Sequence, residues 1–137
     1  MTRAVLDASV FVAAAIRPHG TPAACVRAFA EGRYELIVSP LLLAELRDVL
    51  RRARFHTFLT PDQAERLVDA LGRDALVEAD PPDRPPVSRD RGDDYLGALA
   101  RAAGAHVLVS GDADLLALDL PDLRILPPRE FLELLPS

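Results

Sequence analysis

Short apolar runs alternate along the chain with longer segments in which apolar residues recur every three or four positions. Runs of the first kind are typical of buried strands, and segments of the second kind are typical of helices that bury one face. Strands that alternate with helices indicate an α/β fold with a parallel sheet. The pattern therefore predicts about five parallel strands flanked by helices, with the strands at 4–6, 34–38, 75–77, 106–110 and 124–126.

Proline and capping residues mark the starts of several predicted helices. Ser39 before Pro40 indicates a helix that runs to about Arg52, and Thr60 before Pro61 indicates another, with Gln63 placed for a capping box. Thr21 is expected to cap the helix that contains Pro22 and ends before Gly32. The remaining helices are predicted at 10–16, 93–104 and 129–135.

Four prolines occur between positions 81 and 86. Proline has no backbone N–H to donate to a sheet or helix, so this segment is expected to cross the surface as a loop. We interpret it as a loop inside one domain rather than as a linker between two. The whole chain, residues 1–137, is therefore predicted to form a single domain.

Composition narrows the class of protein. Half of the 137 residues are hydrophobic, and no apolar run approaches the roughly 20 residues that span a bilayer. The single cysteine excludes an intrachain disulfide. An acidic residue as early as Asp7 is not expected in a signal peptide. A cytoplasmic protein without membrane contact is therefore expected. The net charge of −5 is unusual for a nucleic-acid binder, although bound divalent cations would offset it. All 16 basic residues are arginine, which excludes a catalytic lysine.

Acidic residues fall where an open parallel sheet binds its ligands. Asp7 closes the first predicted strand and Asp112 follows the fourth. If these two strands flank the point where strand order reverses, both acids face the same crevice. Glu45 lies in the second turn of the helix after strand two, and Asp94 begins the helix before strand four. Four acids that are distant in sequence can therefore meet at one edge.

Most of these acids also have a purely structural interpretation. Asp7 could cap a helix, Asp112 could serve a turn, and the Asp93-Asp94 pair could complement a helix dipole. Glu45 is harder to explain in this way, because it shares a predicted helical face with Leu41 and no arginine stands three or four positions away. A carboxylate in an apolar stripe needs a partner or a metal.

Carboxylate oxygens are the ligands that Mg²⁺ prefers, and two such ions can activate water against a phosphodiester without a side-chain nucleophile. A haloacid-dehalogenase-like phosphatase also places an aspartate after its first strand. That chemistry needs a second acid two residues later, where this chain has Ser9, and usually a lysine. A response-regulator receiver also needs a lysine, so the absence of lysine counts against that class of protein as well.

Taken together, these segments resemble PIN-domain nucleases, especially the VapC-like toxins of bacterial type II toxin–antitoxin pairs. No one segment is specific, but their order and spacing are. The resemblance covers nearly the whole chain and is carried by residues 5–10, 39–46, 89–96, 108–116 and 128–132. It implies a parallel sheet between helices, cleavage of RNA with Mg²⁺ or Mn²⁺, a small antitoxin partner and a homodimer. The apolar helix with Phe131, Leu132 and Leu135 could contribute to such a surface.

The resemblance also implies roles for individual residues. The catalytic and metal-binding acids of the family match Asp7, Glu45, Asp94 and Asp112, with Asp93 as a substitute or helper for the third.

Further positions match accessory roles. Asp114 corresponds to an accessory acid, and Ser9 and Ser110 correspond to polar positions that hold water or phosphate. Two departures are Ser9, where many relatives carry Asn, and Gly92, where close relatives often carry an acid.

Two alternatives remain open at this point. A degenerate PIN domain that only binds protein or RNA would be expected to lose one or more acids, and here all four are present. The arginines at 47, 51, 52 and 54 are expected to be a solvated helix end, where cations suit the dipole, with contact to RNA or to an antitoxin as the less favoured interpretation. The RNA target is not encoded in any motif that we recognise.

Overall fold

The computed structural model describes residues 1–81, 91–120 and 122–136, and at 91–94 it describes the backbone alone. All the paired strands are parallel and form one five-stranded sheet in the order β3-β2-β1-β4-β5. The predicted α/β class is confirmed. The strands are β1 (Arg3–Leu6), β2 (Glu35–Val38), β3 (Leu76–Val77), β4 (Val107–Val109) and β5 (Arg124–Leu126).

The order of the strands reverses at β1, which pairs with β2 on one side and with β4 on the other. In this register Val5 lies opposite Leu108, and Leu6 lies opposite Val109. Ligands of open parallel sheets bind at the carboxyl ends of the strands beside such a reversal. The residues that follow β1 and β4 therefore share the position at which a site is expected.

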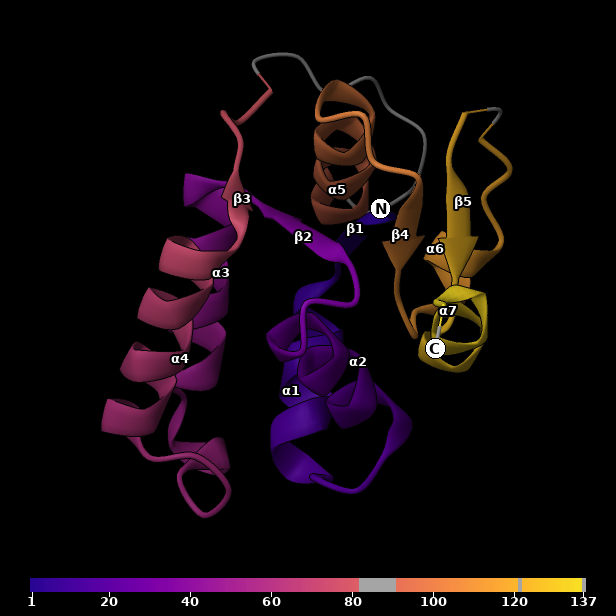
Figure 1. Ribbon diagram of the computed structural model, residues 1–137. Coiled ribbons are helices and arrows are strands. Elements are labelled where there is room, and N and C mark those ends of the chain that lie inside the picture. The colour runs from indigo at the N-terminus through magenta and orange to yellow at the C-terminus, as the bar shows by residue number, and fades with distance from the viewer. Residues whose placement is uncertain (82–90, 121, 137) are drawn as a thin grey trace.

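Helices surround this sheet (Figure 1). The paired helices α3 and α4 lie together beside β3, whereas α6 and α7 lie beside β5, with α1 and α2 between the two groups. No helix of the described part is long and apolar enough to cross a membrane. The helices are α1 (Ala8–Ile16), α2 (Thr21–Ala30), α3 (Pro40–Leu50), α4 (Pro61–Asp74), α5 (Arg91–Ala102), α6 (Ala113–Leu116) and α7 (Pro128–Leu134), with a 3₁₀ turn, η1, at Ala53–Phe55.

Helix starts follow the capping chemistry of the sequence with one exception. The Ser39 side chain accepts from the Leu42 N–H, and Thr60 and Gln63 form the predicted capping box. The prediction that Thr21 caps α2 is wrong, because Gly20 is the N-cap and Thr21 is already helical. Gly20 makes no side-chain cap bond, and Pro22 occupies one of the first two helical positions. Proline is accommodated there because its missing N–H would have no partner within the helix.

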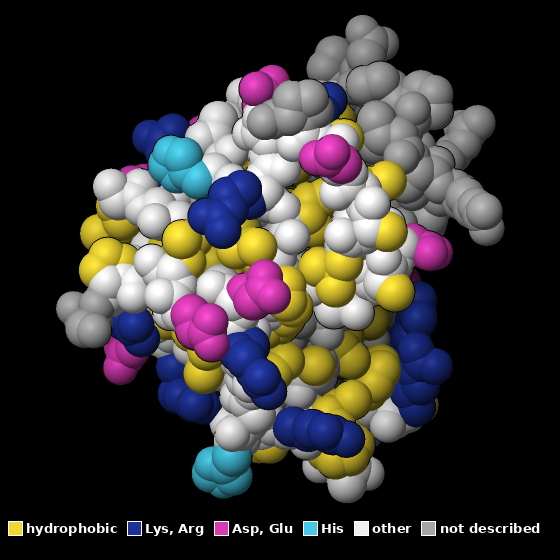
Figure 2. All heavy atoms as spheres, turned by 90° about the vertical axis from the view of Figure 1, so that its right-hand side faces the viewer, with side chains coloured by type: hydrophobic (Ala, Val, Ile, Leu, Met, Phe, Trp, Pro, Cys, Tyr) yellow, Lys and Arg dark blue, Asp and Glu magenta, His cyan; other side chains and the backbone are white. Residues whose placement is uncertain are grey.

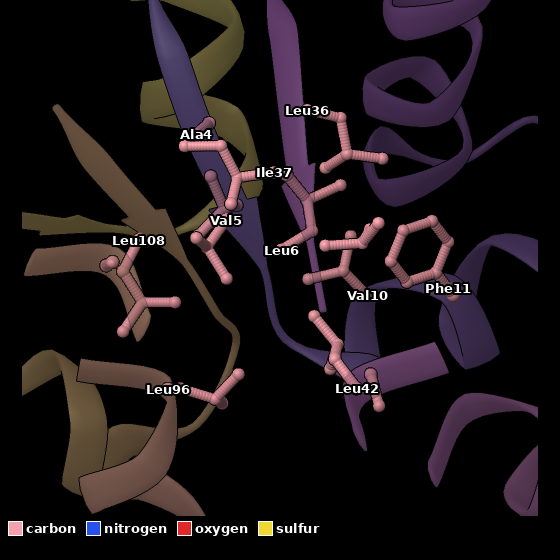
Figure 3. Close-up of a cluster of buried hydrophobic side chains, with 14 of the residues drawn as sticks. Ala4, Val5, Leu6, Val10, Phe11, Leu36, Ile37, Leu42, Leu96 and Leu108 are labelled. Carbon is pink, nitrogen blue, oxygen red and sulfur yellow. The ribbon is translucent and has the colours of Figure 1, made fainter. Parts of the chain in front are cut away.

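The hydrophobic core is built around the central strand, as Figure 3 shows. Ala4, Val5 and Leu6 of β1 are completely buried. Side chains from helices cover them, including Phe11 of α1 and Leu42 of α3. A strand buried on both faces reads as a continuous apolar run, which is why this strand was predictable from sequence.

The C-terminal helix belongs to this core. Phe131 is completely buried and meets Tyr34 edge to face, with ring centroids 4.8 Å apart. The Tyr34 hydroxyl donates to the Cys25 carbonyl at 2.9 Å, which fixes the ring against α2. Leu135 is buried as well. The expectation that Phe131 and Leu135 contribute to a dimer surface is therefore wrong, because both side chains are already covered by the chain itself.

Candidate active site

Asp7 is the first residue after β1 and the N-cap of α1. Its backbone N–H donates to the Val109 carbonyl at 2.9 Å, which continues the pairing of β1 with β4. Two hydroxyls donate to its Oδ2, that of Ser9 at 3.0 Å and that of Ser110 at 2.9 Å. The half-buried carboxylate is thus held in one orientation at the edge where the strand order reverses.

Ser110 joins this carboxylate to the segment after β4. Its side chain is completely buried, and its Oγ accepts from the Asp112 N–H at 2.9 Å while donating to Asp7. Asp112 is exposed and caps α6, with its Oδ1 accepting from the Asp114 N–H at 2.8 Å. One buried hydroxyl therefore holds the Asp7 carboxylate beside the backbone of Asp112. The sequence matched Ser110 to a water- or phosphate-binding position, and this bridging geometry was not foreseen.

The electrostatics of this pair favour a cation. Within the described residues, neither Asp7 nor Asp112 forms an ion pair with an arginine or histidine. Hydroxyl and amide donors stabilise the charges only in part, and carboxylate oxygens are the ligand type that hard divalent cations prefer. The two side chains are therefore of the donor type that a magnesium-like ion would bind. Asp114 lies one residue into α6 beside this pair and is exposed.

Glu45 lies in the second turn of α3, but its surroundings differ from the expected apolar stripe. Its side chain is exposed, and Leu41 on the same face is 44% exposed. The argument that burial demands a metal or a partner for Glu45 is therefore wrong. Across the described residues, no three acidic, histidine or cysteine side chains gather in a group that could hold a metal. The meeting of Glu45 with Asp7 and Asp112 stays a prediction.

Asp93 and Asp94 lie in the first turn of α5, two and three residues after its start at Arg91. Their side chains are outside the described part of the chain, so their predicted contribution to the site also stays a prediction. Their helix packs against β1 and β4, the two strands that Asp7 and Ser110 directly follow.

A second buried network lies nearby and was missed in the sequence. The buried hydroxyls of Ser39, which follows β2, and Tyr95 of α5 are hydrogen-bonded to each other. Tyr95 also donates to Asp80 Oδ1 at 2.5 Å, and Asp80 Oδ2 accepts from the Leu41 N–H at 3.1 Å. Burial and the bond to Asp80 raise the pKa of Tyr95 to about 12, so the phenol remains a donor at neutral pH. The network ties the starts of α3 and α5 together.

The position of Ser39 directly after a strand is the one sequence feature that this network shares with the Ser110 bridge. Ser39 and Ser110 are the two buried polar residues of the described part, and each directly follows a strand. A serine after a strand reads as a helix cap or turn residue in sequence, and only the packing shows that its hydroxyl serves a partner distant in the chain.

A shallow hollow of about 380 Å³ adjoins Ser9 and Asp112. Its other walls are small or apolar side chains of α1, α2 and α7 and the backbone at Gly111. A larger apolar cavity of about 520 Å³ lies between α2, β2 and α4 and includes none of the predicted site residues. Of these two spaces, the hollow beside Asp112 is the one that adjoins predicted site residues.

A parallel α/β sheet with acids after two strands at its reversal point places the chain among the open α/β proteins, which bind ligands outside the carboxyl ends of their strands. Comparison with known families identifies the particular family. A family model described as PIN domain matches residues 3–114, so the chain belongs to the PIN-domain family. Members of this family are generally nucleases that use divalent metal ions. The match includes all four predicted acids and ends before β5 and α7.

Solved structures share the fold at low sequence identity. A chain in the structure of VapBC2 from Rickettsia felis, bound to a DNA fragment from their promoter, matches with a TM-score of 0.64 and 14% identity, over 92% of this chain and 98% of that one. PAE2754 from Pyrobaculum aerophilum matches with a TM-score of 0.57 and 20% identity, over 96% of this chain and 88% of that one. No curated protein matches the sequence.

Proposed function

We propose that the protein is a metal-dependent endoribonuclease that hydrolyses RNA phosphodiester bonds with Mg²⁺ or Mn²⁺. The observation that carries this proposal is the Ser110 bridge, which holds Asp7 beside Asp112 where strand order reverses in a PIN fold. Glu45 from the second turn of α3 and Asp94 from the first turn of α5 would complete the set of metal ligands.

Each residue of the described pair has a defined task. The hydroxyls of Ser9 and Ser110 orient the Asp7 carboxylate through its Oδ2, and the Ser9 backbone N–H donates to Oδ1 at 3.4 Å. A carboxylate oxygen can accept more than one bond, so Oδ1 keeps capacity for a ligand. Asp112 is oriented by capping α6. A bound divalent cation would supply activation of water and stabilisation of charge on the phosphodiester. Asp93 and Asp114 would act as auxiliary acids in this proposal.

The negative net charge of the chain does not exclude an RNA substrate, because RNA contacts depend on where the basic side chains lie on the surface. Figure 2 shows basic side chains spread over one face, among acidic and hydrophobic ones. Phosphate contacts depend on the local distribution of cations rather than on their sum. Basic side chains are therefore available on the surface although the chain carries a charge of −5.

The biological role proposed is that of the toxin in a cytoplasmic toxin–antitoxin pair, with a small antitoxin partner and a homodimeric toxin. The sequence resemblance supports this role, and the fold shared with a chain of VapBC2 is consistent with it. Co-purification of a small partner encoded by the neighbouring gene would test the pairing. Light scattering that finds a monomer at high concentration would contradict the dimer.

Metal dependence gives the direct test of the proposed reaction. We expect cleavage of single-stranded RNA to stop in EDTA and to return with Mn²⁺ or Mg²⁺. Mn²⁺ should also raise the melting temperature of the wild type more than that of Asp112→Asn, since the ion binds the folded state and the variant lacks a ligand charge. Cleavage that persists undiminished in EDTA would exclude the metal role, whatever the melting temperatures.

The Tyr95 network predicts a positioning effect on the site. Tyr95→Phe removes the hydroxyl that joins α5 to Ser39 and Asp80. We expect a loss of roughly tenfold in kcat and in apparent Mn²⁺ affinity, with KM for RNA little changed, as is usual for groups that orient metal ligands. The Mn²⁺ dependence of the initial rate measures both effects.

Tyr34→Phe is the matched control for this prediction. It also removes one buried tyrosine hydroxyl, here bonded to the Cys25 carbonyl, but at a place without predicted site residues. It should lose a similar amount of stability and keep its kcat and Mn²⁺ affinity. Equal losses of activity in both variants would mean that the Tyr95 hydroxyl supports the fold in general and not the site.

A further inference from the structure

The connection between α3 and α4 concentrates positive charge and aromatic side chains. Residues 51–58 contain three arginines, one histidine and two phenylalanines and no acidic residue, although the whole chain carries a net charge of −5. In Figure 1 this connection is the loop at the lower end of α3 and α4. The concentration differs from the rest of the chain and is not explained by the nuclease chemistry.

The charges of this connection are largely available to a ligand. Arg51 and Arg54 are exposed, and neither forms an ion pair with a described residue. Arg52 meets Asp48 only at 3.6 Å, with both side chains at least half exposed. Pairs of this kind contribute little and separate readily. Arg47, in contrast, is engaged by Glu65 at 3.1 Å and by Asp69 at 3.7 Å, and it is not part of the surface considered.

The aromatic side chains have different positions. Phe55 is buried, and its ring lies 4.8 Å from the Arg54 guanidinium, which holds that cation close to the surface. Phe58 is 49% exposed. The turn that presents it is ordered by backbone bonds, with the N–H groups of Phe58 and Leu59 donating to the Phe55 carbonyl at 2.9 and 2.8 Å. An exposed aromatic ring and two arginines without an ion pair to a described residue thus share one short, hydrogen-bonded connection.

We propose that this surface, the α3–α4 patch (Arg51, Arg54 and Phe58), binds single-stranded RNA outside the cleavage site. Proteins that bind single strands combine cations for the phosphates with aromatic rings on which bases stack. An acidic protein segment would use the arginines but would not require the exposed ring. The proposal rests on the proposed function, because it assigns the patch to the same RNA substrate.

The location of the patch fits a contact separate from the acids. Helix α3 begins at Pro40, beside the network at the sheet edge, and its 11 residues lead to the patch. At ~1.5 Å per residue the patch lies about 16 Å along the helix from this edge and about 9 Å from the proposed ligand Glu45. An RNA that reaches both places would be held over several nucleotides, and the patch would contribute to KM rather than to the chemical step.

Binding measured without cleavage tests the proposal. A fluorescent oligouridylate of roughly 16 nucleotides is titrated with the protein in EDTA over a series of KCl concentrations. The double variant Arg51→Gln/Arg54→Gln should bind about tenfold more weakly. Its plot of log K against log salt should be less steep by ~1.4, because each phosphate contact to a single strand contributes about 0.7. Phe58→Ala should lose at least about fivefold in affinity with the slope unchanged.

The matched control is Arg17→Gln/Arg101→Gln, which removes the same charge at two exposed arginines outside the patch that form no ion pair with a described residue. It should keep the affinity and the slope of the wild type to within about twofold. All variants change exposed side chains, so their melting temperatures should equal that of the wild type, and a variant that melts earlier is replaced by Arg54→Gln alone. An equal loss in the patch and control variants would overturn the proposal, because it would show an effect of net charge only.

Further outcomes separate this proposal from the proposed function. A wild type that cleaves RNA with Mn²⁺, together with patch variants of unchanged RNA affinity, would overturn the patch and leave the nuclease intact. A wild type that binds RNA through the patch but does not cleave it would refute the nuclease and leave the patch. Polyglutamate serves as the competing probe: if the patch variants lose affinity for polyglutamate and keep their affinity for RNA, the surface binds an acidic protein and the proposal is overturned.

Discussion

Asp7→Asn is expected to lower the kcat of Mn²⁺-dependent RNA cleavage by at least ~100-fold, because it removes the charge of the acid at the centre of the proposed metal site. The substitution keeps the size of the side chain. Asparagine caps helices about as well as aspartate, and its carbonyl oxygen can still accept from Ser9 and Ser110. The variant should therefore fold, and its melting temperature in EDTA should equal or exceed that of the wild type, since one charge among neighbouring acids is gone. Initial rates at saturating Mn²⁺, with the melting temperature measured in parallel, provide the test.

Asp48→Asn is the matched control for this loss. Asp48 is on α3, its side chain is 78% exposed, and it meets Arg52 only at 3.6 Å. Removing this charge should leave kcat within about twofold of the wild type, as for most surface substitutions. If Asp7→Asn and Asp48→Asn lose activity equally, the distinction between site acids and surface acids is wrong. If neither loses activity, Asp7 is only a helix cap.

Phe131→Ala is expected to reduce the free energy of unfolding by about 3–5 kcal/mol, the usual range for a buried phenylalanine. Phe131 is completely buried and packs edge to face on Tyr34, so its removal leaves a cavity between α7 and α2. For a domain of this size such a loss is a large part of the total stability. Denaturant unfolding should show a lower midpoint with an unchanged m-value.

Phe58→Ala removes the same side chain from an exposed position and should cost less than about 1 kcal/mol. The comparison of Phe131→Ala with Phe58→Ala also tests how far the folded unit extends. Phe131 lies outside residues 3–114, the part matched by the family model. A large difference between the two variants would show that the C-terminal helix is part of the folded unit. Similar small costs would mean that α7 only rests on the surface and that the fold is complete without it.

The sequence by itself determined the longer helices and the strands, and their order along the chain. Strand β1 was predictable because a strand buried on both faces is a continuous apolar run, and α4 because Thr60, Pro61 and Gln63 specify its start by local hydrogen bonds. The placement of Asp7 and Asp112 at the strand ends followed as well, since strand ends are visible in sequence. Short elements such as η1 and α6 were missed, because three or four residues carry too little periodicity to be recognised.

Only the tertiary structure decided how those elements use their side chains. Whether a helix face is buried depends on what packs against it, and the sequence does not show this. The spacing of apolar residues around Glu45 therefore predicted a buried apolar stripe, whereas the structure leaves Leu41 and Glu45 on this face of α3 exposed. From the sequence, Phe131 was expected to lie on a surface that binds a partner, but α2 covers its side chain. The hydroxyls of Ser39 and Ser110 could have been ordinary caps in sequence. Their partners Tyr95 and Asp7 lie 56 and 103 positions away, and contacts over such separations arise only when strands and helices pack.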